Sequence, residues 1–586
     1  MNAPSEPTTL NRLRASRWLA WTVAGLVIVG AAGLVLYANG QMWFYLDDWA
    51  FMSARMPVTA EHLLAAQNQN WHALTVLTFN ALLAVFGFSY LPFRLLAATL
   101  VVVIGVLAYV YTQRRVGRWW ALLPTSAVIV GPGAEILLWP FQMGQLYSLA
   151  AGLTVLALLD RPSRRWTAPA IVVLLFVGVC SSSAGVPILV LFAADRIARH
   201  GHRRQALLAV PAIVLYGLWY RAYGTVGVHP HPVNAGTLDA AAQRSIAVGQ
   251  GALQSLASLQ STGARGALLS RFAPFVLGVV VCWQLFGRVR SDRPRIFGLS
   301  AALVAYWVLL SWGRWFAQVE LSPRYSFLSQ ALLVLLLVEL AVGVVQWLGE
   351  VREEHSHRAR VAAIGVLVLV AVACVVVQVR QVRGELAFGR GLAAAGEVMR
   401  GQTDALALMP DRVAAGATWY LAPVSEHIAV PAPTYLNLLE RLDVPRPTQA
   451  QLRSLPERAR ESADRTLWRT YIRASQPGVP VPFGRAPTVR VVAGSPHMQH
   501  SGSCVSLTDR AIVELGLAPG GAVAVTGRGA GPLTVAGRRY ASIYGAARSP
   551  VAPGRTLLVR LPVDRGRALW HVRLSGTNAR VCSLRR

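Results

Sequence analysis

The stretch "RWLAWTVAGLVIVGAAGLVLYANGQMWFYLDDW", residues 17–49, establishes the fold class of this chain. It begins with an unbroken apolar run over 18–38, and about 20 such residues cross the hydrocarbon core of a bilayer. The run is too long for the apolar core of a signal peptide and lacks a clear Ala-x-Ala cleavage site, so we expect a retained membrane anchor. An aromatic segment follows it and holds two adjacent acidic residues, Asp47 and Asp48.

The composition extends this interpretation to most of the chain. Of the 586 residues, 54% are hydrophobic and only 14% are charged. These values exclude a disordered, collagenous or ordinary soluble protein. The sequence therefore predicts a polytopic α-helical membrane protein. We expect about eleven transmembrane helices, at 18–38, 93–112, 119–133, 144–160, 167–182, 185–198, 205–222, 267–286, 296–313, 325–347 and 361–379.

The arginines indicate which ends of these helices face the cytoplasm. Residues 73–90 are also apolar, but counting them as a span would put Arg114, Arg115 and Arg118 outside, so we expect a helix at the outer interface there. The predicted cytoplasmic segments then hold 20 arginines, against eight in the outer segments before residue 379. The N-terminus is therefore expected inside and the chain after about residue 380 outside. Because these charges lie in short loops at one membrane face, we expect no nucleic-acid partner.

The composition changes after the last predicted span, and four parts result. We expect a cytoplasmic N-terminus (1–17), a transmembrane domain (18–380), an extracytoplasmic region of helices and loops (381–485) and an extracytoplasmic β-rich module (486–586). In the last part, segments such as "TVRVVAG", "GAVAVTG" and "RTLLVRLPVD" alternate apolar and polar residues between Gly/Pro turns. This pattern predicts a β-sandwich-like module.

Two cysteines bracket much of the β-rich module. Cys504 and Cys582 would face an oxidising compartment on the expected topology, and a disulfide between them is one interpretation. The alternative is a pair of unpaired buried thiols. The sequence does not decide between the two.

The acidic pair carries the most informative chemistry in the chain. Asp47 and Asp48 lie among Trp43, Phe44, Tyr45 and Trp49, where two like charges resist desolvation. At least one carboxyl should have a raised pKa unless a cation, a metal ion or a substrate hydroxyl contacts it. The structural alternative is a solvated acidic loop end beside an aromatic belt. The residues indicate no certain cofactor, and a divalent cation at the acidic pair stays open.

The segment after the acidic pair sharpens this interpretation. "NQNWHALTVLTFNALLAVFGFSYLPFRLLAATLV" runs from a polar loop through an apolar helix and the turn at 86–87 to Arg94 at the start of a span. This order resembles the N-terminal region of the GT-C superfamily of polyprenyl-phosphate-sugar-dependent glycosyltransferases, which includes aminoarabinose and protein O-mannosyl transferases. The pair Arg324-Tyr325 in "ELSPRYSFL" is similar to an Arg-Tyr pair often found at the outer end of a late span in that superfamily. The usual Pro-Pro-Leu is replaced by a sequence that begins with His72.

The resemblance implies a reaction at the outer membrane face. An aspartate, Asp47 or Asp48, would act as general base on an acceptor hydroxyl and invert the anomeric carbon. The leaving polyprenyl phosphate would need an arginine, for which Arg324 is the first candidate and Arg94 the second. An arginine that merely snorkels to lipid headgroups is the alternative at both positions. The implied partners are a polyprenyl-phosphate sugar donor, an envelope glycan, lipid or protein acceptor, and the lipid bilayer.

Further acidic residues leave a second function class open. Glu135 and Glu320 are expected on the same outer face, where they could orient the acceptor or pair with an arginine. Glu339 lies well inside a predicted span, a costly position that marks a functional or paired site. The alternative function is a non-enzymatic transporter or envelope-assembly protein, with the acidic pair as an ion or proton site. The arginine-rich composition without lysine is consistent with a GC-rich genome and favours a bacterial plasma membrane protein.

Overall fold

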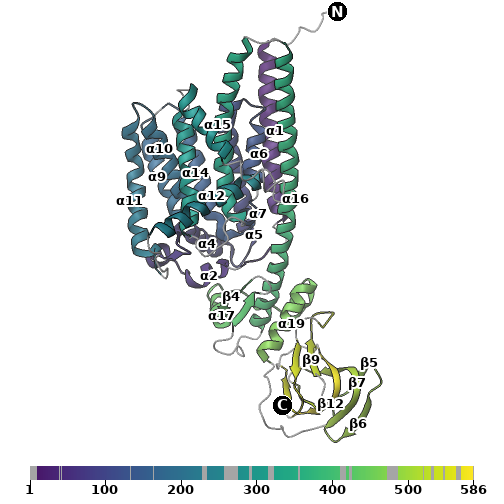
Figure 1. Ribbon diagram of the computed structural model, residues 1–586. Coiled ribbons are helices and arrows are strands. Elements are labelled where there is room, and N and C mark those ends of the chain that lie inside the picture. Colours follow the sequence, from purple (N-terminus) through teal and green to yellow (C-terminus); the bar gives the residue numbers. More distant parts are fainter. Residues whose placement is uncertain are drawn as a thin grey trace, which may run out of the picture. The chain divides into compact units, whose positions relative to one another are not determined.

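The chain forms two compact units in its computed structural model (Figure 1). We refer to Met1–Gly40, Ala54–Leu82 and Tyr90–Gly391 as the helical unit, and to Gln41–Ser53, Leu83–Ser89 and Leu392–Arg586 as the C-terminal unit. The structure describes residues 9–38, 40, 42–45, 47–131, 133–162, 164–226, 234–256, 275–288, 293–313, 323–353, 357–408, 418–421, 425–471, 486–518, 521–529, 533–544, 548–561 and 569–584.

The described part of the helical unit consists almost entirely of helices. A small hairpin of β1 (Ala66–Gln67) and β2 (Asn70–Trp71) interrupts them. The helices are α1 (Thr9–Ala38), α3 (Ala60–Leu64), α4 (Ala73–Phe86), α5 (Leu91–Val116), α6 (Leu122–Val130), α7 (Ala134–Leu138), η1 (Pro140–Gln142), α8 (Met143–Leu159), α9 (Thr167–Ser181), α10 (Gly185–Ala198), η2 (Arg203–Ala209), α11 (Val210–Trp219), η3 (Tyr220–Gly224), α12 (Ala235–Leu256), an apolar helix at Phe275–Phe286 that runs into η5 (Gln284–Arg288), α14 (Arg293–Gly313), α15 (Pro323–Glu353) and α16 (His357–Leu408).

The membrane class of the helical unit agrees with the prediction, whereas the number of spans is not confirmed. Six helices in the described part of the chain are long and apolar enough to cross a membrane. Three more apolar helices are shorter, at Ala73–Phe86, Thr167–Ser181 and Phe275–Phe286. The prediction of eleven spans therefore stays a prediction. The six are Arg17–Ala38, Leu91–Val116, Pro140–Leu159, Arg203–Gly224, Arg293–Gly313 and Arg324–Val342.

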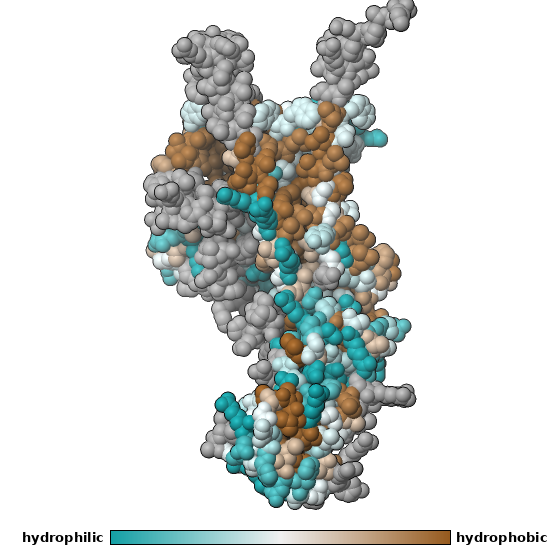
Figure 2. All heavy atoms as spheres, turned by 90° about the vertical axis from the view of Figure 1, so that its right-hand side faces the viewer, coloured by the Kyte–Doolittle hydropathy of each residue, from teal (hydrophilic) through white to brown (hydrophobic). Residues whose placement is uncertain are grey.

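The outer surface of the helical unit is strongly apolar. Figure 2 shows hydrophobic side chains (brown) over much of this unit. On α1, Leu26 is 68% exposed and Val29 is 63% exposed. Water would solvate such a surface poorly, whereas lipid tails are as apolar as these side chains. The exposed apolar side chains thus support a bilayer around the helical unit.

The apolar segment predicted to lie at the outer interface forms helix α4. The helix ends at Gly87, whose backbone N–H donates to the Leu83 carbonyl over 3.0 Å. Gly87 has a φ of 65°, in the left-handed region that favours glycine. The turn at 86–87 is therefore a glycine C-cap.

Helix α16 continues past the predicted boundary at residue 380. Its apolar run ends near residue 379, but the sequence that follows to residue 408 has no proline and holds many alanines and leucines, so the helix continues despite five glycines. The boundary between the helical unit and the C-terminal unit falls between Gly391 and Leu392, within α16. The C-terminal unit also holds α2 (Asp47–Ala54), β3 (Thr418–Leu421), β4 (Ser425–Pro431), α17 (Ala432–Arg441), α18 (Gln449–Ser454) and α19 (Glu457–Tyr471).

The β-rich module contains one eight-stranded, barrel-like sheet in place of the predicted sandwich of two sheets. Strands β7 and β12 are each 14 residues long and pair along their whole length. At a bulge between Thr577 and Ala579, β12 exchanges its second neighbour from β9 to β8. The two long strands β7 and β12 therefore run through the whole sheet, and β12 joins β9 at one end to β8 at the other. The strands are β5 (Val489–Ala493), β6 (His497–Ser501), β7 (Cys504–Leu517), β8 (Ala522–Gly527), β9 (Leu533–Arg538), β10 (Arg548–Val551), β11 (Thr556–Arg560) and β12 (Trp570–Ser583).

The sheet encloses an apolar core that α19 closes. Val513 and Val572 from the two long strands are buried there with Trp468 of α19. Cys504 and Cys582 lie directly opposite each other on β7 and β12 and form a disulfide. The structure therefore decides between the two interpretations of this pair in favour of the disulfide.

Candidate functional site

The acidic pair forms the first turn of α2. Asp48 fixes this turn, because its Oδ2 accepts the Tyr45 backbone N–H over 2.9 Å and its own N–H donates to the Tyr45 carbonyl over 3.0 Å. The positive end of the α2 dipole favours both carboxylates. Asp48 is fully buried, whereas Asp47 is 9% exposed. Asp48 thus holds the loop in shape, and Asp47 is the better candidate for direct contact with a substrate.

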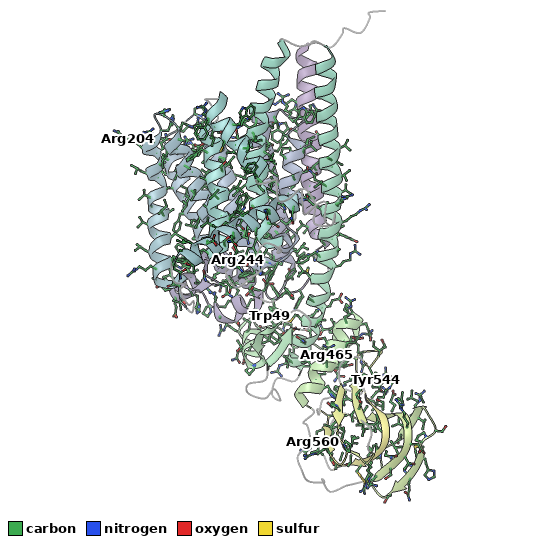
Figure 3. All side chains as sticks on the ribbon, viewed as in Figure 1. Trp49, Arg204, Arg244, Arg465, Tyr544 and Arg560 are labelled. Carbon is green, nitrogen blue, oxygen red and sulfur yellow. A yellow bond between two sulfur atoms is a disulfide. The ribbon has the colours of Figure 1, made fainter. Side chains whose placement is uncertain are left out.

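Aromatic rings surround the acidic turn. Trp49 (labelled in Figure 3) is fully buried, and its ring centroid lies 5.7 Å from Phe88 and 5.0 Å from Tyr435 of α17. Its indole N–H donates to the Phe44 carbonyl over 3.1 Å. Phe44 in turn lies 5.0 Å from Phe88. These rings exclude water from the back of the turn and hold the carboxylates at a low-dielectric boundary.

Helix α16 adds two charged residues to this aromatic cluster. The Arg400 guanidinium lies 5.1 Å from the Trp43 ring centroid, and its Nε lies 3.8 Å from Asp404 Oδ2. Burial raises the pKa of Asp404 to about 6, although Arg400 opposes the shift. Burial and then the nearby Asp404 charge raise the pKa of Tyr435, and a hydrogen bond between Tyr435 and Thr403 opposes this shift. Asp404 can therefore exchange a proton near neutral pH, at the edge of the ring cluster that supports α2.

No motif in the sequence marks Arg400, Asp404 or Tyr435 as functional residues. The i,i+4 spacing of the first two residues is readable from the sequence. Their position beside Trp43 and Trp49 depends on contacts across more than 350 residues of chain, and no local pattern signals it.

Two of the predicted substrate-binding residues face the segment η1 in the helical unit. The His72 ring is buried, and its centroid lies 5.0 Å from that of Phe141. Arg94 lines a hollow of about 200 Å³ together with Trp139 and Pro140. Its Nη2 also donates to the Leu36 carbonyl in the last turn of α1 over 2.9 Å. Arg94 therefore caps a helix end, which is a structural role that the sequence analysis did not foresee.

The other predicted binding residues are placed only in part. Arg324 lies in the first turn of α15 with its guanidinium 4.9 Å from the Tyr325 ring centroid. The Tyr325 carbonyl accepts the Tyr306 hydroxyl over 3.1 Å. Glu135 belongs to α7, next to η1 in the chain, and Glu320 lies outside the described residues. The structure thus brings His72 and Arg94 to one segment and describes Arg324 at a separate helix start.

Glu339 has the partner that the sequence could not assign. Its carboxylate is 1% exposed, accepts the Tyr111 hydroxyl and pairs with Arg115 Nε over 2.9 Å. Arg115 also pairs with Asp160 over 2.9 Å. Glu339 is therefore part of an ion-pair network at the C-terminal end of α5, far along that helix from Arg94 at its start.

The same network continues into two more helices. Arg295 of α14 contacts Asp160 over 3.1 Å and Asp195 of α10 over 3.3 Å. Asp195 is fully buried and also bonds Arg196 Nε over 2.7 Å. Opposite charges from several helices pair here, which offsets part of the cost of burying them.

The described residues contain no group of three or more His, Cys, Asp or Glu side chains that could hold a metal ion. A scan against protein-family models and a search of curated proteins found no match to this chain. Its function is therefore proposed from its own residues.

Proposed function

We propose that this chain is a GT-C-like glycosyltransferase of the bacterial plasma membrane, with its N-terminus in the cytoplasm and its C-terminal unit outside. It would transfer a sugar from a polyprenyl phosphate to a glycan, lipid or protein acceptor of the cell envelope. The observation that carries the proposal is the acidic turn of α2. There, a fully buried Asp48 holds the loop and presents the less buried Asp47 beside it.

The turn is suited to general-base catalysis. The Asp47 carboxylate would take the proton of an acceptor hydroxyl while that oxygen attacks the anomeric carbon. The bond between this carbon and the phosphate oxygen breaks, and the sugar inverts. Aromatic rings behind the turn keep it rigid and partly dry, which strengthens the interaction of a carboxylate with a developing positive charge.

The leaving polyprenyl phosphate needs a cation, and arginine binds phosphate oxygens with two parallel N–H groups. We propose Arg324 for this role ahead of Arg94, because the Arg94 guanidinium already donates to the Leu36 carbonyl. His72, Tyr325, Glu135 and Glu320 remain proposed contributors to substrate binding.

The transporter hypothesis is less well supported. It uses the acidic pair as an ion or proton site, and Glu339 is a further ionisable residue within a predicted span. Glu339 is bonded to Tyr111 and Arg115, so its burial has a structural reason. The acidic pair lies in the C-terminal unit, whereas a transport site is expected near the bilayer midplane between helices.

The test is release of polyprenyl phosphate by the purified protein in nanodiscs, measured with a panel of polyprenyl-phosphate sugars and envelope extracts as acceptors. Asp47→Asn should lower turnover at least 100-fold, since a general base contributes about 10²–10⁴. Asp48→Asn should cause a smaller loss, because an amide oxygen can still accept the Tyr45 N–H. The matched control is Glu61→Gln on the exposed surface of α3, which should leave turnover unchanged.

Two results would contradict the proposal. Full activity of the folded Asp47→Asn variant would exclude Asp47 as the base. Absence of turnover by the wild-type protein with every donor would favour the transporter or envelope-assembly hypothesis.

A further inference from the structure

The outer face of the sheet carries a cluster of charged residues that the proposed transferase reaction does not use. On β7 and β12, Glu514 lies directly opposite Arg573, and on β12 and β9, His571 lies opposite Arg538. Directly opposed residues share a face of a sheet. Tyr544, labelled in Figure 3, belongs to the same cluster and is 9% exposed.

One carboxylate organises the cluster. Glu514 accepts the Tyr544 hydroxyl over 2.6 Å and contacts His571 Nδ1 over 3.0 Å, with Arg538 Nη2 3.8 Å away. Burial opposes ionisation of Glu514, but these hydrogen bonds and the Arg538 charge hold its pKa below the usual range. Glu514 is therefore ionised and fully engaged, and it orients the Tyr544 ring.

Arg573 is held in place without using its hydrogen-bond donors. Its guanidinium carbon lies 4.0 Å from the Tyr544 ring centroid, a cation–π stack that fixes the plane of the group. The Arg573 guanidinium group forms no hydrogen bond or ion pair with the residues that the structure describes, and its Nε is buried and unpaired. The Arg538 guanidinium stacks on the same ring at 4.9 Å. Two guanidinium groups thus converge on one tyrosine beside a histidine, and Glu514 is the carboxylate that contacts this cluster among the described residues.

We propose that Arg573, with Arg538 and His571, forms a binding site for a phosphate or carboxylate group of an anionic envelope polysaccharide. A pre-oriented guanidinium with unused donors binds an oxyanion with two parallel hydrogen bonds. The Arg538 and Arg573 side chains are half-buried and fixed against the Tyr544 ring, whereas Arg490, opposite Glu514 on β5, is exposed. Recognition of a lipid surface needs about 4–8 exposed basic residues. A single charged group that projects from a polymer suits two fixed guanidinium groups better. Binding needs neither Asp47 nor Asp48 and does not rest on the proposed reaction.

The experiment measures binding of fluorescein-labelled polygalacturonate to the full-length protein in nanodiscs of zwitterionic lipid, without any sugar donor. Neutral dextran of the same size tests the need for charge, and inorganic phosphate serves as competitor. We expect saturable binding of polygalacturonate, none of dextran, and displacement by phosphate. Arg573→Gln should weaken binding at least tenfold. The matched control is Arg560→Gln at an exposed position on β11, which removes the same charge and should leave binding unchanged.

A second variant and a lipid assay test whether binding depends on this cluster of residues and on a polysaccharide ligand. Arg538→Gln, on a different strand, should also weaken binding, and thermal unfolding of each variant shows whether the module is folded. Equal loss in Arg573→Gln and Arg560→Gln would overturn the proposal, because binding would then follow net charge. Failure of the wild-type protein to bind polygalacturonate would overturn it as well. Arg573-dependent binding to vesicles of anionic lipid alone would assign the site to the membrane surface and refute the polysaccharide.

Discussion

Replacement of Glu339 by leucine should destabilise the helical unit by about 3 kcal/mol. The carboxylate is 1% exposed and bonds two groups, the Tyr111 hydroxyl and Arg115 Nε. Without it, the buried Tyr111 hydroxyl loses its acceptor, which costs about 1–3 kcal/mol. Loss of one partner of a buried ion pair costs about 3–5 kcal/mol. Because Arg115 keeps Asp160 at 2.9 Å, the total should lie at the low end of that range.

The assay is thermal unfolding of the purified protein in detergent, followed by intrinsic tryptophan fluorescence. A loss of about 3 kcal/mol should lower Tm by roughly 5–10 °C. The control is Asp239→Asn on α12, an exposed position where the amide can still accept the Gln243 hydrogen bond, so Tm should not change. The double variant with Tyr111→Phe should be less destabilised than the sum of the single variants, by about 1 kcal/mol. If Glu339→Leu and the control have the same Tm, the carboxylate is not a structural partner, and Glu339 is again a candidate for a functional role within the membrane.

Three further predictions concern the C-terminal unit. Burial, opposed by Arg400, raises the pKa of Asp404 to about 6, so the folded state binds more protons than the unfolded state between about pH 4 and pH 6. Through Asp404 the free energy of unfolding should therefore fall by up to roughly 2–3 kcal/mol as pH rises through that window. Burial also raises the pKa of Asp464 to about 6, so Asp404→Asn should reduce this pH dependence without abolishing it in denaturant titrations at each pH. Asp464 accepts the backbone N–H groups of Arg539, Tyr540 and Ala541. Asp464→Ala should therefore lower the stability of this unit by about 3 kcal/mol in thermal unfolding, whereas a loss below about 0.5 kcal/mol would show that these groups find other acceptors. The disulfide closes a loop with a sequence separation of 78, so Cys504→Ser should lower the free energy of unfolding by about 4 kcal/mol. Guanidinium unfolding with and without reductant measures this loss. Equal unfolding midpoints for the wild type and the variant without reductant would contradict the prediction.

Much of the fold could be predicted because its signals are local. Apolar runs of about 20 residues predict membrane helices, and their arginine-rich ends predict a sidedness. Alternating residues predict the β-rich module. The number of spans is less accessible, because several apolar helices in the structure are shorter than a bilayer crossing requires.

The candidate site could be predicted only in its acidic core. The position of Asp47 and Asp48 among aromatic residues is visible in the sequence. Only the tertiary structure shows that Asp48 accepts a hydrogen bond within the loop and that Arg94 donates to the end of α1. The spacing of Arg400 and Asp404 carries no sign that Trp43 and Tyr435 lie beside them.

The sequence by itself determined the membrane class, the β-rich C-terminal module and the location of the acidic pair. Each of these depends on the composition or the periodicity of residues that are neighbours in the chain. Only the tertiary structure decided that β7 and β12 belong to one barrel-like sheet, that Cys504 and Cys582 are bonded, and that Glu339 is paired. These features depend on partners from 53 residues apart, as for Leu517 and Trp570, to more than 220 residues apart. Many residues of the right type could serve as such a partner, and packing of the whole chain selects one of them.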